Sequence, residues 1–463
     1  MIRHRRRFRV LSAAVVAGAV LATAPLVSRA QVTPTVANRV GGTGDDGAKP
    51  LSLTEAVALA QRNLPAVVQA RNQERSAAAS TRAAKGALIP TLAISGNTGY
   101  AAGTTINPQG ALVPQNSANP WSYSNQLNMG VQLFDGGRRF SEIKRNSFVA
   151  EQANIAVLTS RYDAALQAKQ QFYAALAARE SEGAARAQLE QAEQQLRASI
   201  ARLNAGVITK SDSLRSIIQV GNAQLAILTA QNDLRVANAL LTRITGSEQL
   251  VTANPADTLY VPMPEITEAE LLRVVPDAPA IQLSEATLSV AKAAKRTQRA
   301  AYLPTVNASF GYSFRATDSN LTPNKFVLPF RNNASNQNWG LSFTYPLFDG
   351  FTRELNATNT AIAVENAEAN LRDAKLAARA NLSTQLRSLN NANARIQVQL
   401  QSIAAADEDL RVMQQRYQLG ASTLLDLLTS QTQLNQARQS LIQARFDARV
   451  AKAQLESLLG REL

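Results

Sequence analysis

Residues 416–428 read Arg-Tyr-Gln-Leu-Gly-Ala-Ser-Thr-Leu-Leu-Asp-Leu-Leu, and residues 202–212 read Arg-Leu-Asn-Ala-Gly-Val-Ile-Thr-Lys-Ser-Asp. The two stretches start 214 residues apart and carry an Arg, a Gly, a Thr and an Asp at matching positions. A glycine suits the left-handed residue that ends a helix, and a threonine suits the cap that begins the next one. Gly206 and Gly420 therefore predict the turns of two helical hairpins, called tip 1 and tip 2.

The step of 214 residues recurs along most of the chain, which is the signature of an internal duplication. It relates residues 89–91 to 303–305, residues 134–136 to 348–350, and Gly246 to Gly460. We therefore expect two tandem structural repeats, residues 51–246 and 266–460, joined by a linker of residues 247–265.

Each repeat contains a pair of stretches in which apolar and small polar residues alternate, at about 91–134 and about 305–348. Alternation of this kind predicts strands with one apolar face, and strands of about 10 residues match an outer-membrane barrel. A soluble, half-buried hairpin would show the same alternation. Residues 101–120 are expected to be a polar loop between the first two strands. The predicted lipid-facing side chains are Leu127, Met129, Val131, Phe310, Tyr312, Phe314, Leu341, Phe343 and Tyr345.

Four strands cannot close a barrel, and an open sheet edge would leave backbone groups unsatisfied in lipid. Strands that span a membrane therefore imply an oligomer. Two chains would supply eight strands with a filled interior, and three would supply twelve with room for a lumen. If the protein exports material through a lumen, three chains are favoured over two.

Residues 138–205 and 353–419 contain no Pro, and their only Gly is Gly183. Each predicts a helix of some 67 residues, on the order of 100 Å long. These helices open the predicted hairpins of residues 138–245 and 353–459, with Asp135 and Asp349 placed to cap them. A seven-residue spacing predicts coiled-coil packing. The seam comprises Leu382, Leu389, Ile396, Ile403, Leu410 and Tyr417, with Leu189, Leu196 and Leu203 in the first repeat.

The first 30 residues combine a basic start, a short apolar run and a small-residue site at residues 28–30, which predicts a cleaved secretory signal peptide. A retained membrane anchor is the alternative. Residues 31–50 are expected to be flexible. The chain carries 48 basic and 34 acidic residues, and the six Arg of residues 1–30 leave 42 basic residues, or +8, after cleavage. No basic face remains that would indicate nucleic acid as a partner.

The sequence has no Cys, and its single His is His4. This composition excludes thiolate nucleophiles, His-based triads and zinc ribbons. The acidic pair at residues 45–46 lies in a Gly-rich segment, and the three acidic residues 407–409 lie on a solvated helix face. We therefore expect no enzyme, and no catalytic, cofactor or metal site.

The second hairpin resembles the signature of the TolC-like outer-membrane efflux proteins, and the likeness runs from Leu53 to Gly460. The residues that carry it are Arg416, Tyr417, Gly420, Asp426, Leu427, Leu428, Gln431, Leu434, Ala437 and Arg438.

The resemblance implies a trimeric duct in the cell outer membrane, with a twelve-stranded transmembrane β-barrel continued by a periplasmic α-helical coiled-coil barrel. Such a duct is the exit of a tripartite efflux pump or type I secretion system. It docks a periplasmic adaptor and an inner-membrane pump of the RND, ABC or MFS type. The adaptor-docking residues would be Gly206, Val207, Thr209, Gly420, Ala421 and Thr423.

The same resemblance implies a polar gate at the tips, formed by Ser211, Asp212, Tyr417 and Asp426. Two positions depart from the family: Ser422 stands where members carry an Arg, and Thr429 where they carry a second acid. The usual salt link is therefore not expected, and Lys210 and Arg215 are the candidates to substitute for it. Helix capping is the alternative role of the Gly and Asp residues, and coiled-coil packing that of Tyr417. A periplasmic coiled-coil scaffold or adaptor that does not span the outer membrane is the alternative function.

Overall fold

The computed structural model describes residues 47–100, 103–115, 121–258, 267–318 and 333–463. The predicted signal peptide and most of the predicted flexible segment lie outside the described residues. The helices and strands belong to one unit, formed by residues 47–463.

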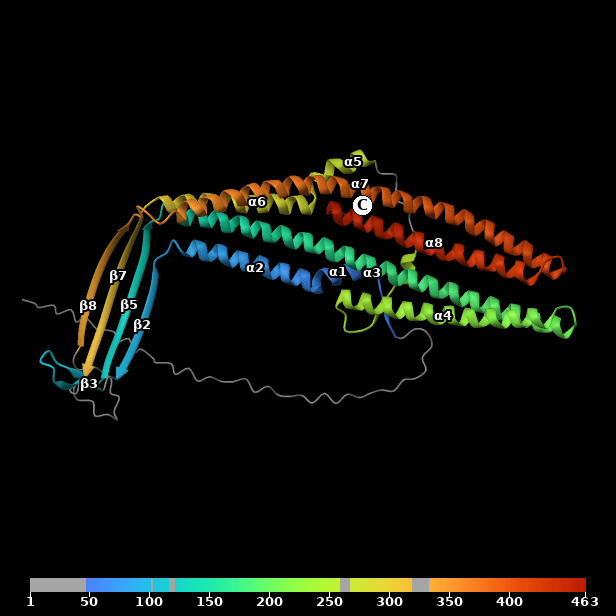
Figure 1. The fold of residues 1–463 in the computed structure, drawn as a ribbon, viewed down its shortest axis with the longest axis horizontal. Coiled ribbons are helices and arrows are strands. Elements are labelled where there is room, and N and C mark those ends of the chain that lie inside the picture. The colour runs from blue at the N-terminus through green and yellow to red at the C-terminus, as the bar shows by residue number, and fades with distance from the viewer. Residues whose placement is uncertain (1–46, 101–102, 116–120, 259–266, 319–332) are drawn as a thin grey trace, which may run out of the picture. The chain divides into compact units, whose positions relative to one another are not determined.

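Eight α-helices are present in the described residues, four in each half of the unit (Figure 1). In chain order they are α1 (Leu53–Asn63), α2 (Pro65–Gly86), α3 (Arg138–Asn204), α4 (Lys210–Thr245), α5 (Glu268–Val274), α6 (Pro279–Arg299), α7 (Thr352–Gln418) and α8 (Leu424–Leu459). Helices α3 and α7 each have 67 residues, and α4 and α8 each have 36. Pro65 and Pro279 open α2 and α6, where a missing N–H costs nothing.

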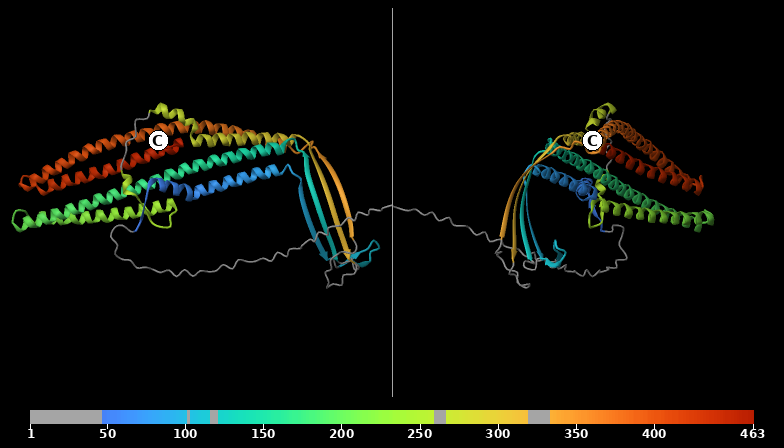
Figure 2. Two further views of the ribbon diagram at one scale, coloured as in Figure 1. Left: turned by 180° about the vertical axis from the view of Figure 1, so that it is seen from behind. Right: turned by 60° about the vertical axis from the view of Figure 1, so that its left-hand side comes forward.

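Four antiparallel strands form one curved sheet at one end of the long helices, in the order β2-β5-β7-β8 (Figure 2). They are β2 (Thr91–Tyr100), β5 (Trp121–Phe134), β7 (Thr305–Asp318) and β8 (Asn333–Thr344). The two repeats meet at the β5–β7 pair, and β2 and β8 are the edges.

The register of the strands places the apolar residues on one face of the sheet, because directly opposed residues of an antiparallel pair point the same way. Leu92 lies opposite Met129, Met129 opposite Phe310, and Phe310 opposite Trp339. The rings of Phe310 and Trp339 lie 4.4 Å apart. Tyr345 was expected on the last strand, but β8 ends one residue before it.

Two segments that were expected to be irregular contain strands. Within the predicted loop, β3 (Gly103–Ile106) and β4 (Leu112–Gln115) form a hairpin. Its turn is held by the Asn107 side chain, which accepts hydrogen bonds from the backbone N–H groups of Gln109 and Ala111.

The predicted flexible segment and the predicted linker pair with each other. β1 (Lys49–Leu51) runs parallel to β6 (Val251–Ala253), which is followed by a 3-10 turn, η1 (Pro255–Thr258). Leu51 and Val251 are buried in the same cluster as Phe172 of α3. Burial of this apolar surface accounts for the order, and local alternation could not reveal it.

The long helices pack as two hairpins, α3 with α4 and α7 with α8, and α8 also packs against α3. In the second hairpin the predicted seam is confirmed: Leu382, Leu389, Ile396 and Leu410 are buried. In the first hairpin the predicted leucines are only half-buried. The buried seam there is made of small residues four positions earlier, Ala185, Ala192 and Ser199.

The junction between sheet and helix in the first repeat is held by Asp135. Its carboxylate accepts hydrogen bonds from the backbone N–H groups of Gly137 and Arg139 and from Arg139 Nε, each at 3.0 Å. Gly136 has a positive φ, and a Cβ there would lie 2.7 Å from the Leu303 Cβ. Glycine is therefore required where the strand turns into α3.

The second repeat has a looser junction. Asp349 accepts a hydrogen bond from the Arg353 backbone N–H at 3.2 Å. Arg353 Nε lies 3.0 Å from the Asp349 carboxylate but is not aligned for a hydrogen bond. The N-cap of α7 is Phe351, in the left-handed region at φ 65°.

Replacement of Asp135 by Ala is expected to lower the free energy of unfolding by about 3 kcal/mol, because it leaves the buried Arg139 charge without its partner. The matched variant Asp349→Ala should cost about 1 kcal/mol, since that pair is more exposed. Denaturant unfolding followed by helix content measures both, and equal costs would contradict this account of the junctions.

Candidate functional site

Both tips are closed by the same backbone motif. In tip 1 the N–H groups of Gly206 and Val207 donate to the carbonyls of Leu203 and Arg202, each at 2.9 Å. In tip 2 the N–H groups of Gly420 and Ala421 donate to the carbonyls of Tyr417 and Arg416. This Schellman motif needs a left-handed residue, and the glycines have φ values of 74° and 76°.

The helices that leave the tips begin with capping boxes. Thr209 and Thr423 are the N-caps, and each hydroxyl accepts a hydrogen bond from the backbone N–H three residues on, at 3.3 Å. The carboxylates of Asp212 and Asp426 accept in return from the N–H and hydroxyl groups of those threonines. Both predicted gate acids thus serve as capping residues within this chain. Ser211 is exposed and does not act as the cap.

The capping box lowers the pKa of the carboxyl group in tip 2. The backbone and side-chain hydrogen bonds from Thr423 lower the pKa of Asp426, and the nearby Arg416 lowers it further. Asp426 is therefore ionised throughout the neutral range.

Tyr417 connects the two hairpins through Arg202, a residue to which the sequence analysis assigned no contact between hairpins. The Arg202 guanidinium lies 4.7 Å from the centre of the Tyr417 ring, and Arg202 Nη1 donates to the Tyr417 carbonyl at 3.4 Å. A guanidinium at this distance is attracted by the ring electrons. The equivalent Arg416 instead donates to Ala421 within its own tip. Because both arginines belong to the same turn motif, no local signal separates their roles.

Tip 2 also holds two buried hydroxyls, Tyr417 Oη and Ser422 Oγ, that have no hydrogen-bond partner among the described residues. The Tyr417 ring packs against a buried cluster of Leu410, Leu424, Leu427 and Leu434. Tip 1 has a polar pair in its core, in which the hydroxyls of Ser199 and Ser216 lie 3.0 Å apart. The core of tip 2 is therefore mainly leucine, whereas that of tip 1 includes a polar pair.

The outer surface of the tips carries apolar and glycine residues, as a docking surface requires. Val207, Leu419 and Leu425 are exposed, and the predicted docking residues Gly206, Thr209, Gly420, Ala421 and Thr423 are exposed beside them.

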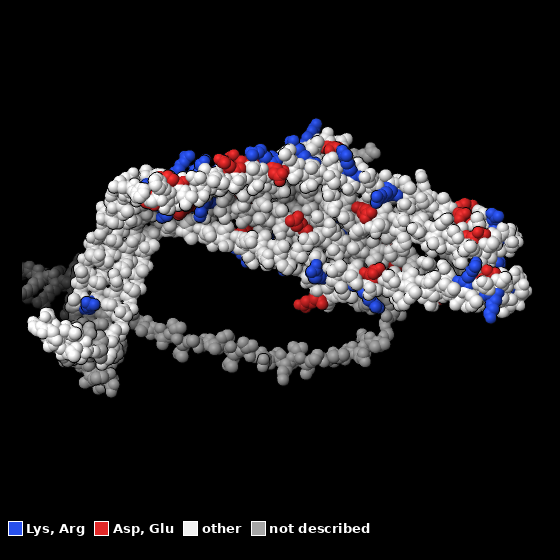
Figure 3. Space-filling view, in the orientation of Figure 1, with Lys and Arg blue, Asp and Glu red and all other residues white. Residues whose placement is uncertain are grey.

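The sheet differs from the helices in its charge. Among the residues of β2, β5, β7 and β8, only Arg315 and Asp318 are charged. Figure 3 shows the acidic and basic residues spread along the helices, with the sheet almost free of them. The helices that the structure describes include none with the length and apolarity of a membrane span.

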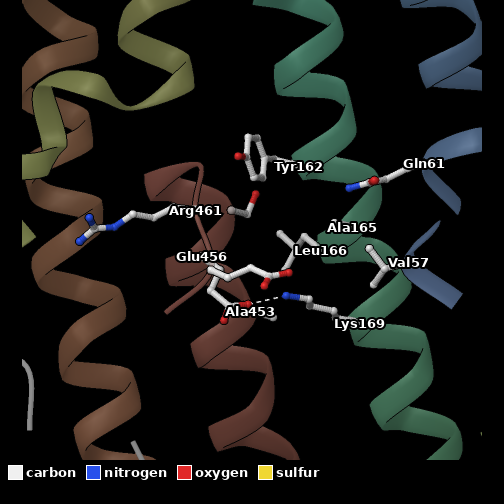
Figure 4. Close-up of a pocket in the computed structure, with 11 residues that line it drawn as sticks. Val57, Gln61, Tyr162, Ala165, Leu166, Lys169, Ala453, Glu456 and Arg461 are labelled. Carbon is white, nitrogen blue, oxygen red and sulfur yellow. Dashed lines mark hydrogen bonds and ion pairs between the residues drawn. The ribbon is translucent and has the colours of Figure 1, made fainter. Parts of the chain in front are cut away.

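A small pocket lies where α1, α3 and α8 meet (Figure 4). Lys169 Nζ reaches across it to Glu456 Oε2 at 2.5 Å, and the Glu456 carboxylate also accepts from the Leu463 N–H. This ion pair ties the first repeat to the end of the second. In the described part of the chain, acidic groups and histidines form no cluster that could hold a metal ion.

Comparison with known proteins identifies the family. Residues 56–247 and 276–461, one segment in each repeat, match the family model of the outer membrane efflux proteins. The chain therefore belongs to the outer membrane efflux protein family, which confirms the resemblance seen in the second hairpin.

Several curated relatives are similar to the chain. Over 399 residues it is 26% identical to protein CyaE of Bordetella pertussis, with 84% of this chain and 80% of the relative covered. It is 26% identical over 375 residues to the cation efflux system protein CusC of Escherichia coli K12, with 74% of each covered. It is 27% identical over 284 residues to the outer membrane protein TolC of the same strain, with 59% and 56% covered.

Solved structures show the same fold. CusC superposes with a TM-score of 0.73 at 18% identity, covering 92% of this chain and 96% of that one. The Campylobacter jejuni CmeC outer membrane channel gives 0.72 at 16% identity, covering 88% and 85%. The protein is accordingly an outer-membrane channel protein of a Gram-negative-type envelope, and the expectation that it is not an enzyme is confirmed by its family.

The charge on Asp426 predicts a pH dependence for tip 2. A carboxyl whose pKa is lowered by folding adds stability above its ordinary pKa of 3.8, and this stability is lost as the pH falls through the folded value. The melting temperature of the protein should exceed that of Asp426→Asn at pH 7, and the two should converge as the pH falls through the lowered pKa of the folded state.

Thr423→Ala is the matched control, because it removes the hydroxyl of the capping box and should cost about 1 kcal/mol. A difference between the protein and Asp426→Asn that is independent of pH would contradict the assigned role of the carboxylate.

Proposed function

We propose that three copies of this chain form the exit duct of a tripartite efflux pump or type I secretion system. Twelve strands would form a barrel in the outer membrane, and the helical hairpins would extend into the periplasm. The duct performs no covalent chemistry, so the energy for transport comes from its partners.

One observation carries this proposal: a four-stranded sheet with an apolar, nearly uncharged face has two edge strands and is joined directly to helices of 67 residues. A sheet in lipid must be closed to satisfy its backbone, and a single chain supplies too few strands. The names of the relatives CusC, a cation efflux protein, and OpmQ, a pyoverdine export outer membrane protein, support an export role.

The tips are the proposed docking surface for a periplasmic adaptor, behind which an inner-membrane pump would stand. Their exposed turns present glycines and apolar side chains, and their shape is fixed by the Schellman motifs and capping boxes. Because each tip closes its own backbone–backbone hydrogen bonds, separation of the hairpins would break the side-chain bond from Arg202 to the Tyr417 carbonyl and leave the turns intact.

We propose that the gate is the contact between hairpins at Arg202 and Tyr417, with Ser211, Asp212 and Asp426 beside it. Ser422 does not supply the charge that other family members have at its position. Arg202, which lies over the Tyr417 ring, provides a cation from the other tip.

The protein should be recovered from the outer-membrane fraction as a trimer whose electrophoretic mobility changes on heating, and it should conduct ions in planar bilayers. A barrel must unfold before its strands separate, which explains the effect of heating. A monomer in the soluble periplasmic fraction would contradict the channel and support the scaffold function.

The gate is tested by conductance. The double variant Asp212→Ala with Tyr417→Ala should raise single-channel conductance, and Arg202→Gln should raise it as well, because each weakens the contact between hairpins. Tyr417→Phe is the matched control: it keeps the ring beneath Arg202 and removes a hydroxyl that makes no hydrogen bond to the described residues, so conductance should stay near that of the parent. A parental conductance in the first two variants would exclude these residues from the gate.

A further inference from the structure

The two strand pairs of the repeats have the same register. In the first repeat Leu92 lies opposite Met129, and in the second Val306 lies opposite Phe343. Both partners shift by 214 residues, the step of the duplication. The sheet therefore preserves the geometry of the duplicated unit residue by residue.

The contact between repeats has a register of its own. Across β5 and β7, Leu127 lies opposite Tyr312, Met129 opposite Phe310, and Val131 opposite Ala308. This pair joins the last strand of one unit to the first strand of the next. The last strand of the second unit is β8, and the first strand of a further copy would be β2.

Strand β5 continues beyond its pairing with β2 because it pairs there with β7 of the second unit. Residues 131–134 of β5 lie beyond the reach of β2, whose pairing stops at Thr91 opposite Gly130. All of them except Leu133, at the irregularity, pair with β7. The equivalent residues 345–348 follow β8, which stops at Thr344 opposite Thr305. Their apolar side chains are exposed to solvent: Tyr345 is 48%, Leu347 84% and Phe348 74% exposed.

We propose that β8 of one copy pairs with β2 of the next in the register that joins β5 to β7, and that residues 345–348 become part of β8 at this contact. The proposal rests on the trimeric channel proposed above. It specifies the seam of the sheet, which is the strand pair that joins neighbouring copies. Subtracting or adding 214 places Leu341 opposite Thr98, Phe343 opposite Gly96, and Tyr345 opposite Ile94 of the next copy.

The side chains of the two edges fit this register. Apolar Leu341, Phe343 and Tyr345 fall on the same face as Ile94 and Leu92, so the apolar face of the sheet continues across the seam. On the other face Ser342 meets Asn97 and Thr344 meets Ser95. A slip of one residue would turn every side chain to the wrong face, so only shifts of two residues compete.

Pro346 is a departure from strict equivalence, because its counterpart is Gln132. A proline has no N–H, so it removes at most one ladder hydrogen bond. It also biases Tyr345 toward an extended conformation, which suits a strand. The equivalent site in the first repeat already carries an irregularity, between Gln132 and Phe134.

The helices support the same arrangement. α8 packs on α7 of its own unit and on α3 of the other, whereas α4 packs on α3, α1 and β6. Gln431 of α8 is 6% exposed, and its counterpart Ile217 of α4 is 51% exposed. The exposed apolar residues of α4 are thus available to α7 of the next copy. They include Leu214, Ile217, Ile218, Leu225 and Leu228.

The absence of Cys from the sequence allows a direct test by disulfide formation in the full chain. Thr98→Cys with Leu341→Cys should link copies into covalent dimers and trimers on oxidation, seen without reductant on a gel. Within one chain the two positions lie on opposite edges of the sheet. Three strand spacings, about 14 Å, separate them across the strands, and they are also offset along the strands, so a disulfide cannot join them.

Two register-shifted pairs serve as controls, Thr98→Cys with Phe343→Cys and Thr98→Cys with Trp339→Cys. They should give at least about fivefold less linked product, because diagonal neighbours are too far apart for good disulfide geometry. The equivalent pair inside the chain, Leu127→Cys with Tyr312→Cys, should form an intramolecular disulfide and shows that this type of position can be linked.

The trimer and its conductance are measured separately on each variant. If the trimer conducts and the intramolecular control forms, but a shifted pair links best or none links, the register is overturned while the channel stands. If no trimer forms in the parent chain, both the seam and the channel are overturned. Preferential linkage of positions 98 and 341 supports the proposed seam.

Discussion

Backbone groups in lipid must be paired within protein, and this requirement shapes the rest of the molecule. The sheet satisfies it internally at three strand pairs and leaves β2 and β8 as edges. One of those pairs, β5 with β7, joins the two repeats. The same kind of contact, between β8 of one copy and β2 of the next, would close a ring of copies. Duplication would thus supply both the strands of the channel and the register of the contact between copies.

The two repeats are alike in backbone and different in chemistry. Both have helices of 67 and 36 residues, Schellman turns and capping boxes. However, Asp135 forms a buried ion pair where Asp349 forms a more exposed one. The seam of the first hairpin is made of alanine and serine, and that of the second is made of leucine and isoleucine. Arg202 reaches Tyr417, whereas Arg416 would meet Leu203 of a neighbouring copy in the same geometry. A ring of three chains would therefore alternate aromatic and aliphatic contacts at its tips.

Much of the fold could be predicted because its signals are local. Gly206, Gly420 and the threonines after them specify turns through their own backbone chemistry, and the alternation of residues 305–314 specifies a face. The missed features depend on contacts between distant segments. β1 pairs with β6 only because Leu51 and Val251 are buried against Phe172. Tyr345 lies outside β8 because a strand ends where its partner does. The contact of Arg202 with Tyr417 is set by how the two hairpins pack, which a turn motif shared by both cannot reveal.

The unbroken length of α3 has a mechanical consequence. Lys169, held to Glu456, is 35 residues from the end of α3 at Asn204, a distance on the order of 50 Å along the helix. With no proline to absorb bending, a rotation of about 5° at that point would move the tip by about 4 Å. A tip displacement of that size would be large enough to separate the Arg202 guanidinium from the Tyr417 ring.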